Sequence, residues 1–389
     1  MRAAPKLPDP RTLLELRLIP GLGDRGLARI LDRARSEKEG VEAAWSWAER
    51  WCRGRGRPLP SRSAVAESAT LLRESCRAAG VAIRTRGEAG YPSALEALPD
   101  PPHVLFLRGR LELLESGRLV TVVGARHCTP TGRRTAHALA RELAEAGVVV
   151  ISGLALGVDG AAHRGALEGG GGTVAVLGSG VDVPHPPSHG RLFRTLARRG
   201  LLVSEFLPGT PPRAHHFPRR NRILAALPKG VVVVEAARRS GAIITANQAV
   251  DLGREVMAVP GHVEDPGVQG NLDLFRDGAK VVWGAQDVFH HLEWRWPPAE
   301  GPQRPWRPEA EAESTEQALI LSALAESGPR TVEELTRAVG LAPQRVLTVV
   351  STLEVSGRVT TGPDRAVSLP REPASSSGGS RPVRGRGKG

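Results

Sequence analysis

Seven short apolar runs, rich in β-branched residues, recur between residues 119 and 284, and each is followed by Gly, Ser, Glu or Pro. The runs are Leu119–Val123, Val148–Ile151, Val174–Leu177, Leu201–Val203, Val231–Val234, Val256–Val259 and Val281–Trp283. Because the runs are continuously apolar, they predict strands buried on both faces. Helix-like segments separate them, and strands that alternate with helices form a mostly parallel, doubly wound sheet. The predicted fold class is therefore α/β.

The turn after the first run is the sharpest local signal. Leu119–Val123 ends at Gly124, a loop carrying Arg126 follows, and a helix-like stretch extends over about 133–146. In a doubly wound sheet such a turn lies at the carboxyl edge, where backbone N–H groups and a helix N-terminus face a bound anion. The pattern predicts an anion-binding turn.

Further turns at strand ends repeat this arrangement, in Ser152–His163, Gly178–Asp182 and Glu235–Ala246. Several glycine-containing turns on one sheet edge, with arginines nearby, form an extended anion track, and a single nucleotide cofactor does not need so many. The candidate contacts from all these turns are Gly124, Arg126, Gly132, Ser152, Gly153, Gly157, Ser240, Gly241 and Thr245. Within the same turns, Asp159 is interpreted as a helix cap, and His163 is as consistent with packing as with ligand contact.

The most basic stretch, Pro211–Arg222, adds four arginines around one aromatic residue. Arginines neutralise successive phosphates while an aromatic ring stacks on a base, which suits a single strand because only a single strand presents unstacked bases. The candidate contacts are Arg213, Phe217, Arg219, Arg220, Asn221 and Arg222. The alternative is a solvated charged loop leading into a helix that starts near Asn221.

Composition supports a polyanionic partner. The 389 residues carry a net charge of +12, with a pI of about 10.8, and residues 119–284 contain 19 Lys and Arg against 13 Asp and Glu. Such an excess is ordinary for a protein that meets phosphates, although a generally basic proteome is the alternative explanation. Three scattered cysteines indicate neither a disulfide framework nor a zinc site. The chain has no apolar stretch of membrane-spanning length and no signal-peptide pattern, so we expect a soluble, cytoplasmic protein.

The sequence offers no defensible catalytic set. Glu205 and Glu235 end strands, where carboxylates often cap neighbouring helices, and no metal-ligand cluster or Ser/His/Asp arrangement is apparent. The alternative is a Rossmann-like nucleotide phosphoribohydrolase, but its Pro-Gly-Gly-x-Gly-Thr turn is missing, and Gly124–Gly132 is not a dinucleotide fingerprint. We expect a DNA-binding protein that is not an enzyme and needs no cofactor or metal.

The flanks predict further domains. Two helices around Ile19–Gly23 give a helical domain over 1–60 that is either a DNA-contacting helix-hairpin-helix or a plain packing unit. The α/β domain occupies 63–293, and a Pro-rich linker occupies 294–313. Three helices and a hairpin over 314–369 predict a winged helix with a net charge of about −1, and 370–389 form a basic tail that is disordered by composition.

These motifs resemble the DNA-processing protein DprA (Smf) family over roughly 105–290. The matching segments are 124–132, Ser152-Gly-Leu-Ala, 161–167, Ala175-Val-Leu-Gly, 216–222, Val234-Glu-Ala, 240–246, Gly253-Arg-Glu-Val and Ala258-Val-Pro-Gly. The resemblance implies an extended Rossmann-like fold, single-stranded DNA binding, a homodimer, and delivery of incoming DNA to the recombinase RecA in natural transformation. It places the family's phosphate-binding arginine on Arg126 and its basic and aromatic residues near Arg213 and on Phe217.

The sequence departs from the family pattern at several turn positions. Ala125 replaces a usual Ser, Thr131 an aromatic, Leu156 an Arg, and His185-Pro186 a usual Tyr-Pro, while Ala226-Leu227-Pro228 replaces Gly-Leu-Ser. The lost arginine at Leu156 removes one charge from the expected DNA track, so that turn is expected to contact DNA through its amides.

Overall fold

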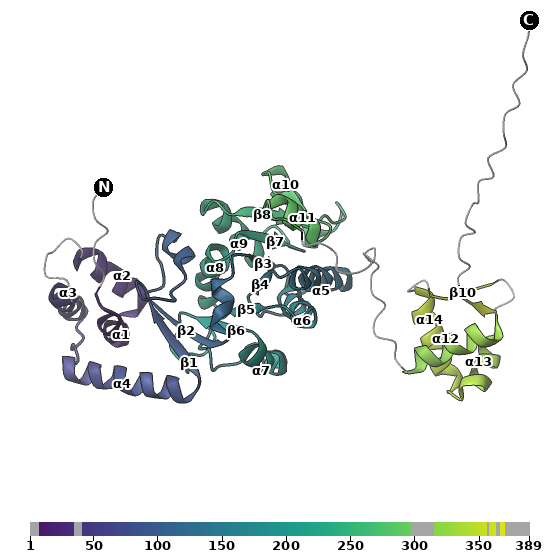
Figure 1. Ribbon diagram of the computed structural model, residues 1–389, viewed down its shortest axis with the longest axis horizontal. Coiled ribbons are helices and arrows are strands. Elements are labelled where there is room, and N and C mark those ends of the chain that lie inside the picture. The colour runs from purple at the N-terminus through teal and green to yellow at the C-terminus, as the bar shows by residue number, and fades with distance from the viewer. Residues whose placement is uncertain (1–7, 35–40, 297–314, 356–357, 363–365, 370–389) are drawn as a thin grey trace, which may run out of the picture. The chain divides into compact units, whose positions relative to one another are not determined.

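The computed structural model describes residues 8–34, 41–296, 315–355, 358–362 and 366–369 (Figure 1). The chain divides into two compact units, residues 1–302 and residues 303–389. We describe each unit by itself. None of the described helices is both long and apolar enough to cross a membrane.

A nine-stranded sheet forms the centre of the larger unit (Figure 1). Its strands are β1 (Val81–Thr85), β2 (Val104–Gly109), β3 (Leu119–Val123), β4 (Val149–Ser152), β5 (Thr173–Val176), β6 (Leu201–Ser204), β7 (Gly230–Val233), β8 (Glu255–Ala258) and β9 (Lys280–Val281). Their order is β1-β2-β6-β5-β4-β3-β7-β8-β9. The strands from β6 to β9 in this order are parallel, whereas β2 is antiparallel to both β1 and β6. The predicted mostly parallel α/β sheet is confirmed.

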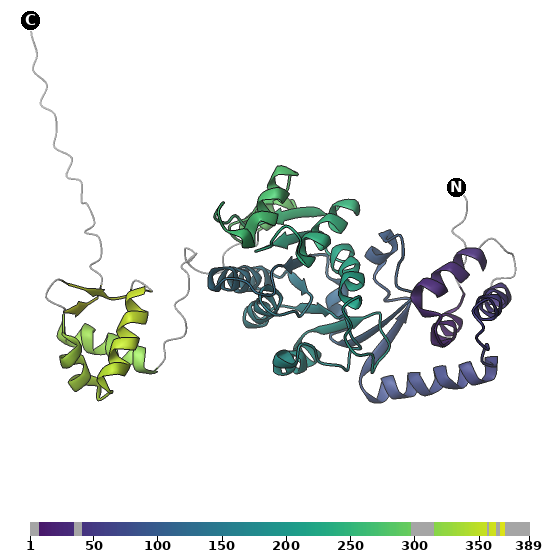
Figure 2. The same ribbon diagram turned by 180° about the vertical axis from the view of Figure 1, so that it is seen from behind.

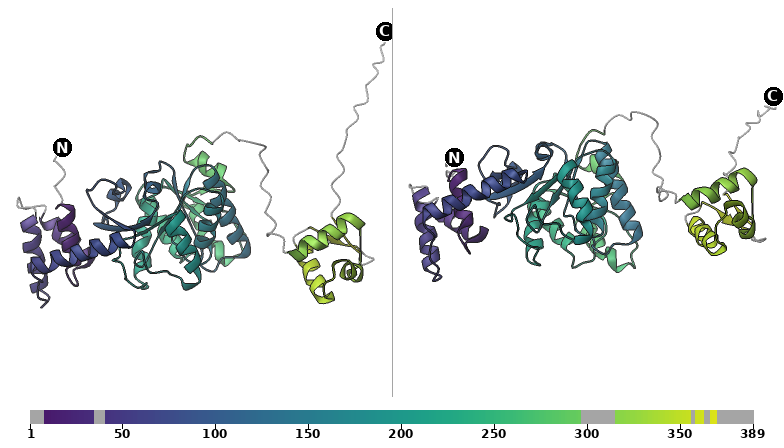
Figure 3. Two further views of the ribbon diagram at one scale, coloured as in Figure 1. Left: turned by 60° about the horizontal axis from the view of Figure 1, so that its bottom comes forward. Right: turned by 90° about the horizontal axis from the view of Figure 1, so that it is seen from below.

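Helices cover both faces of the sheet (Figure 3). On one face lie α4 (Arg62–Ala78), α5 (Pro130–Glu145), α6 (Val158–Glu168), α7 (Gly190–Arg199) and α11 (Ala285–His291), and on the other α8 (His216–Ala226), α9 (Gly241–Asp251) and α10 (Gln269–Arg276). Alternate residues of one strand enter different cores: Val120 and Val122 pack with α5 and α6, and Leu119 and Val123 pack with α8 and α9. This two-sided burial explains why the strands are continuously apolar.

The N-terminal helices are α1 (Pro10–Leu18), α2 (Gly23–Ala34) and α3 (Val41–Arg53), seen from behind in Figure 2. The predicted hairpin around 19–23 is present, and Gly21 and Gly23 have the positive φ values that such a turn requires. Leu14 of α1 lies in the same apolar cluster as Phe106 of β2. Because the helical segment shares a core with the sheet, it belongs to the larger compact unit, and its separation as a domain over 1–60 stays a prediction.

The smaller unit contains α12 (Thr315–Ser327), α13 (Val332–Val339) and α14 (Pro343–Val355), followed by an antiparallel pair, β10 (Thr360–Thr361) and β11 (Val367–Ser368). Thr331 and Glu334 form a capping box at the start of α13. Three helices and a two-stranded wing confirm the predicted winged-helix pattern. Most of the predicted linker over 294–313 and all of the predicted tail over 370–389 lie outside the described residues.

Candidate nucleic-acid interface

The turns that follow β3, β4 and β7 meet at the carboxyl edge of the sheet. β3 and β7 are neighbours in the sheet, but the connection after β3 leads to β4 on one side and the connection after β7 leads to β8 on the other. Ligands of doubly wound sheets bind where the strand order reverses in this way. Hydrogen bonds join the three turns: the Ala125 amide donates to the Glu235 carbonyl at 2.6 Å, and the Val158 amide donates to the Ala125 carbonyl at 3.2 Å. The predicted meeting of the turns at one edge is therefore confirmed.

A pocket opens beside these turns, between the β3 turn and the start of α8. Arg126 and Phe217 both line it, and the remaining lining residues are Gly153, Leu154, Ala155, Leu156, Leu177, Gly178, Ser179, His185 and Pro186. The Arg126 guanidinium carbon lies 5.1 Å from the centre of the Phe217 ring, and the His185 ring lies 5.6 Å from that ring at an interplanar angle of 40°. The pocket thus combines an exposed cation with two aromatic rings.

Phe217 is held in place by its neighbour and by a glycine. The His216 ring stacks on Phe206 at 4.1 Å between ring centres, and its Nδ1 lies 3.0 Å from the Gly178 carbonyl oxygen. A Cβ added to Gly178 would lie 2.9 Å from the Phe217 ring, so glycine is what lets the ring approach this backbone so closely. The start of α8 is therefore rigidly attached to the end of β5.

Burial and the nearby Arg126 guanidinium lower the pKa of His185. The imidazole is therefore neutral at physiological pH and offers a flat polarisable ring, while the positive charge in the pocket resides on Arg126. The peptide bond between His185 and Pro186 is cis. Sequence reasoning noted this pair only as a departure from the family pattern and did not include it among the candidate contacts.

The turn after β4 is organised by two buried charges. The Asp159 carboxylate accepts hydrogen bonds from the amides of Gly153 (3.1 Å) and Ala155 (3.3 Å). The interpretation of Asp159 as a helix cap is wrong, since Gly157 occupies the N-cap of α6 and Asp159 reaches back to the preceding turn. Arg220 faces Asp159 and donates to the carbonyls of Gly153 and Val176. The Gly153 amide is therefore occupied within the protein.

The predicted DNA contacts at Arg220, Asn221 and Arg222 are also wrong, because these side chains are buried. The helix α8 begins at His216, five residues before the expected start, so the arginines after it point to different sides of a helix. Arg220 and Arg222 are only 4% and 7% exposed, and Asn221 is also buried, with its amide donating to the Gly241 carbonyl at 3.2 Å. Burial lowers the pKa of Arg220 to about 10, against the opposing effect of Asp159.

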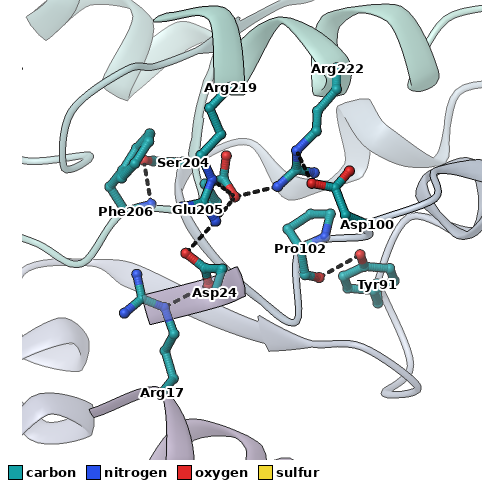
Figure 4. Close-up of polar contacts among 10 residues, drawn as sticks. All are labelled: Arg17, Asp24, Tyr91, Asp100, Pro102, Ser204, Glu205, Phe206, Arg219 and Arg222. Carbon is teal, nitrogen blue, oxygen red and sulfur yellow. Dashed lines mark hydrogen bonds and ion pairs between the residues drawn. The ribbon is translucent and has the colours of Figure 1, made fainter. Parts of the chain in front are cut away.

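Figure 4 shows what the remaining arginines of α8 contact. Arg219 and Arg222 converge on the buried carboxylate of Glu205, at 3.0 and 2.5 Å. Arg219 also pairs with Asp24 of α2 at 2.5 Å, and Arg222 lies 3.5 Å from Asp100. This buried ion-pair network ties α8 to the end of β6 and to the N-terminal hairpin. Burial raises the pKa of Glu205, whereas the two arginines oppose that effect.

The other predicted contacts divide into exposed and structural groups. Arg213 and Gly241 are exposed, and Gly157 and Ser240 are half-buried at the carboxyl edge, with the Ser240 hydroxyl capping α9. In the structural group, two glycines are packed closely: Gly124 against Val158 and Gly132 against Glu235. The other two members, Ser152 and Thr245, are buried, and their hydroxyls donate to the carbonyls of Val122 and Gly241. Glu235 accepts from the Thr129 amide and hydroxyl at the start of α5, which confirms its predicted helix-capping role.

Two segments of the chain match known protein families. Residues 82–293 match the family described as DNA recombination-mediator protein A, and residues 302–365 match the DprA winged helix domain. The first match alone spans more than half of the chain. The chain belongs to the DprA family.

Two curated DprA-family proteins show how far the likeness extends. The DNA processing protein DprA of Bacillus subtilis is 41% identical over 202 residues, which cover 52% of this chain and 68% of that protein. Protein Smf of Escherichia coli is 45% identical over 204 residues, which cover 52% of this chain and 54% of that protein. The aligned part is therefore only about half of the E. coli relative.

Two solved DprA structures share the fold. The X-ray structure of DprA from Streptococcus pneumoniae superimposes with a TM-score of 0.59 and 31% identity, covering 74% of this chain and 97% of that one. A structure of DprA from Helicobacter pylori superimposes with a TM-score of 0.50 and 28% identity, covering 55% of this chain and 95% of that one, and is described as revealing that protein's single-stranded DNA binding mode.

Proposed function

We propose that the protein binds single-stranded DNA in the pocket between Arg126 and Phe217. The observation that carries this proposal is the exposed Arg126 guanidinium, which lies 5.1 Å from the half-buried Phe217 ring. A base stacks on Phe217 and His185, and the adjoining phosphate pairs with Arg126. A duplex does not fit this arrangement because its bases are stacked and paired. The described binding mode of the H. pylori relative supports the same ligand class.

Three carboxylates near the strand ends support a binding role over the hydrolase alternative. Asp159 is bonded to turn amides, Glu205 is enclosed by two arginines, and Glu235 holds the start of α5. A nucleotide hydrolase needs a carboxylate that is free to act on the substrate or a water molecule. These three side chains are instead occupied by partners within the protein.

Family membership supports a broader role as part of this proposal. The protein covers incoming single strands and hands them to the recombinase RecA during recombination or transformation, acting as a homodimer without cofactor or metal. The exposed Arg213 and Gly241, with the half-buried Ser240, extend the contact along the sheet edge. Filament assembly by RecA on oligonucleotides, with and without the protein, tests this part: an unchanged assembly rate contradicts it.

The DNA-binding proposal is tested by fluorescence anisotropy with labelled oligo-dT at two salt concentrations. We expect binding without metal or nucleotide that weakens as salt rises. Arg126→Ala is expected to reduce the salt dependence and the affinity. Phe217→Ala is expected to cost about 1–3 kcal/mol of binding free energy if a base stacks on the ring.

Arg238→Ala provides the matched control, because this exposed arginine is already paired with Asp273 at 2.7 Å. Its loss is expected to leave the affinity within a factor of about two. Equal affinities of the Arg126→Ala, Arg238→Ala and unmodified proteins would show that Arg126 contacts no phosphate.

A further inference from the structure

The outer face of α7 carries a row of arginines that do not line the pocket of Arg126 and Phe217, called the base pocket below. Arg191, Arg194 and Arg198 are exposed and occupy positions i, i+3 and i+7 of the helix, so they lie on one face. On the inner face, Phe193 and Leu196 are buried in the core shared with β2, β5 and β6. The arginines are therefore not needed to attach the helix to the sheet.

The positive charge on this face is not compensated. α7 contains no acidic residue, and within the described part of the chain no carboxylate forms an ion pair with the three arginines. Five exposed arginines of other elements do have such partners: Arg53–Glu49, Arg62–Glu42, Arg110–Glu112, Arg238–Asp273 and Arg345–Glu316.

The arrangement also works against the stability of the helix. Like charges at i and i+3 repel, and Arg191 in the first turn opposes the helix dipole. By comparison, α4 mixes Arg73 and Arg77 with Glu67 and Glu74. A helix that carries cations without anions is less stable for it, and a bound anionic ligand would supply the negative charge that its own residues lack.

The arginine face begins beside the base pocket. His185 and Pro186 line the pocket, and the short 3₁₀ turn Pro187–His189 leads from them directly into α7. His189 Nδ1 lies 3.2 Å from the carbonyl oxygen of Leu154, another pocket residue, so the N-terminus of α7 is fixed to the pocket wall. Because α7 connects the carboxyl end of β5 to the amino end of the parallel strand β6, the helix leads from the pocket toward the opposite sheet edge.

A further cation lies at this junction on α6. Arg164 is exposed, and burial of part of its side chain together with the neighbouring Arg133 guanidinium lowers its pKa. Arg164 in turn contributes, after burial, to the lowered pKa of His189. Positive charge therefore continues from Arg133 in the first turn of α5, through Arg164 in the middle of α6, to the start of α7.

We propose that the arginine face of α7, formed by Arg191, Arg194 and Arg198, holds the sugar-phosphate backbone of a single strand where the strand leaves the base pocket. This inference rests on the proposed function and extends it. Arg191 and Arg198 are separated by seven residues, or about 10 Å along the helix. That length corresponds to about three nucleotides at the 3.4 Å rise of a stacked strand.

The test compares a long and a short oligonucleotide, oligo-dT of about 20 and about 5 nucleotides, on the full-length protein carrying Arg191→Ala, Arg194→Ala and Arg198→Ala. Alanine is a strong helix former, so α7 is expected to persist, which circular dichroism verifies. Loss of three phosphate contacts is expected to reduce the salt slope for the long strand by about 2 and its affinity at 0.1 M salt about 10–100-fold. The affinity for the short strand is expected to be unchanged.

The matched control removes the same charge elsewhere, through Arg73→Ala, Arg77→Ala and Lys280→Ala, all exposed on α4 and β9. It is expected to bind both oligonucleotides as the unmodified protein does. Replacing the three α7 arginines by lysine keeps the charge and is expected to retain most of the long-strand affinity.

If the triple α7 variant binds the long strand with the same affinity and salt slope as the control variant, the α7 proposal is overturned, but the proposal for the pocket is not. A variant that loses affinity for duplex DNA but not for the long single strand would overturn it as well, by showing that the face binds duplex. Arg126→Ala distinguishes the pocket proposal from the α7 proposal, because loss of the pocket contact is expected to weaken binding of both the long and the short oligonucleotide. If the unmodified protein binds neither oligonucleotide, the proposed function and this extension fail together.

Discussion

Replacement of Gly157 by alanine probes the contact that holds Arg126 at the pocket. Gly157 has φ +74°, and a Cβ built on it would lie 2.2 Å from the carbonyl oxygen of Ala125 and 2.5 Å from that of Arg126. Both oxygens belong to the backbone, so no side-chain rotation can relieve the overlap. The turn carrying Arg126 has to move away from the turn after β4.

Three contributions set the size of the effect. Placing alanine in a left-handed conformation costs about 1–2 kcal/mol, and forcing an extra methyl group into a packed site typically costs about 1–3 kcal/mol. Separation of the turns also weakens the hydrogen bond from the Val158 amide to the Ala125 carbonyl, worth about 1 kcal/mol. Together they predict a loss of about 3–6 kcal/mol in the free energy of unfolding.

Gly147→Ala provides a control that separates backbone strain from the clash. Gly147 has φ +78°, almost the same conformation, but no atom lies within 4 Å of a Cβ built there. Urea unfolding should therefore show a loss of only about 1–2 kcal/mol for this variant. Anisotropy with oligo-dT, measured where both variants are folded, should show weakened binding for Gly157→Ala and unchanged binding for Gly147→Ala. Equal stabilities and equal DNA affinities of the two variants would refute the argument that close backbone approach positions Arg126.

Three further outcomes are expected. Glu205→Gln should destabilise the protein by about 3–5 kcal/mol in urea unfolding, because it leaves the buried Arg222 and the half-buried Arg219 without their shared carboxylate. Glu112→Gln, in an exposed pair, should cost less than about 1 kcal/mol; similar losses would contradict the structural role of the network. Burial lowers the pKa of His163 to about 3 from an ordinary value near 6.5, so the unfolded chain takes up a proton first as the pH falls. Stability should therefore be lost below about pH 6.5, by about 2–3 kcal/mol at pH 4.5 relative to His163→Asn, and parallel pH profiles of the two proteins would argue against it. Deletion of residues 314–389 should leave most single-strand binding intact in anisotropy, and a large loss would assign the main contact to the winged helix.

The ion-pair network of α8 shows why sequence reasoning misjudged the most basic segment. The four arginines and Phe217 form one run in the sequence, and nothing local distinguishes an arginine that faces solvent from one that faces a buried carboxylate. Glu205 lies 14 residues before Arg219, and Asp24 lies on another element altogether. Partners so distant in sequence become visible only when the chain is folded.

His185 illustrates a different omission. Its ring reaches Phe217 from the loop after β5, 32 residues earlier in the chain, and no spacing within either segment points to the other. An aromatic residue directly before a proline, after a glycine-containing strand end, is the only local signal that could have included it. Conversely, Gly153 of the β4 turn was identified correctly as a turn former but not as a residue whose amide is already bonded within the protein.

The sequence by itself determined the strands and the sheet edge at which the turns lie. Continuous β-branched runs specify strands buried on both faces, and the glycines after them specify turns at the carboxyl end of a parallel sheet. These are local or periodic properties, so hydrophobic burial and backbone sterics express them without knowledge of distant residues. Only the tertiary structure decided which arginines remain available to a ligand. A guanidinium is available when no carboxylate or carbonyl from another element reaches it, and that depends on three-dimensional packing, which leaves Arg126 at the pocket and encloses Arg220 and Arg222 in the core.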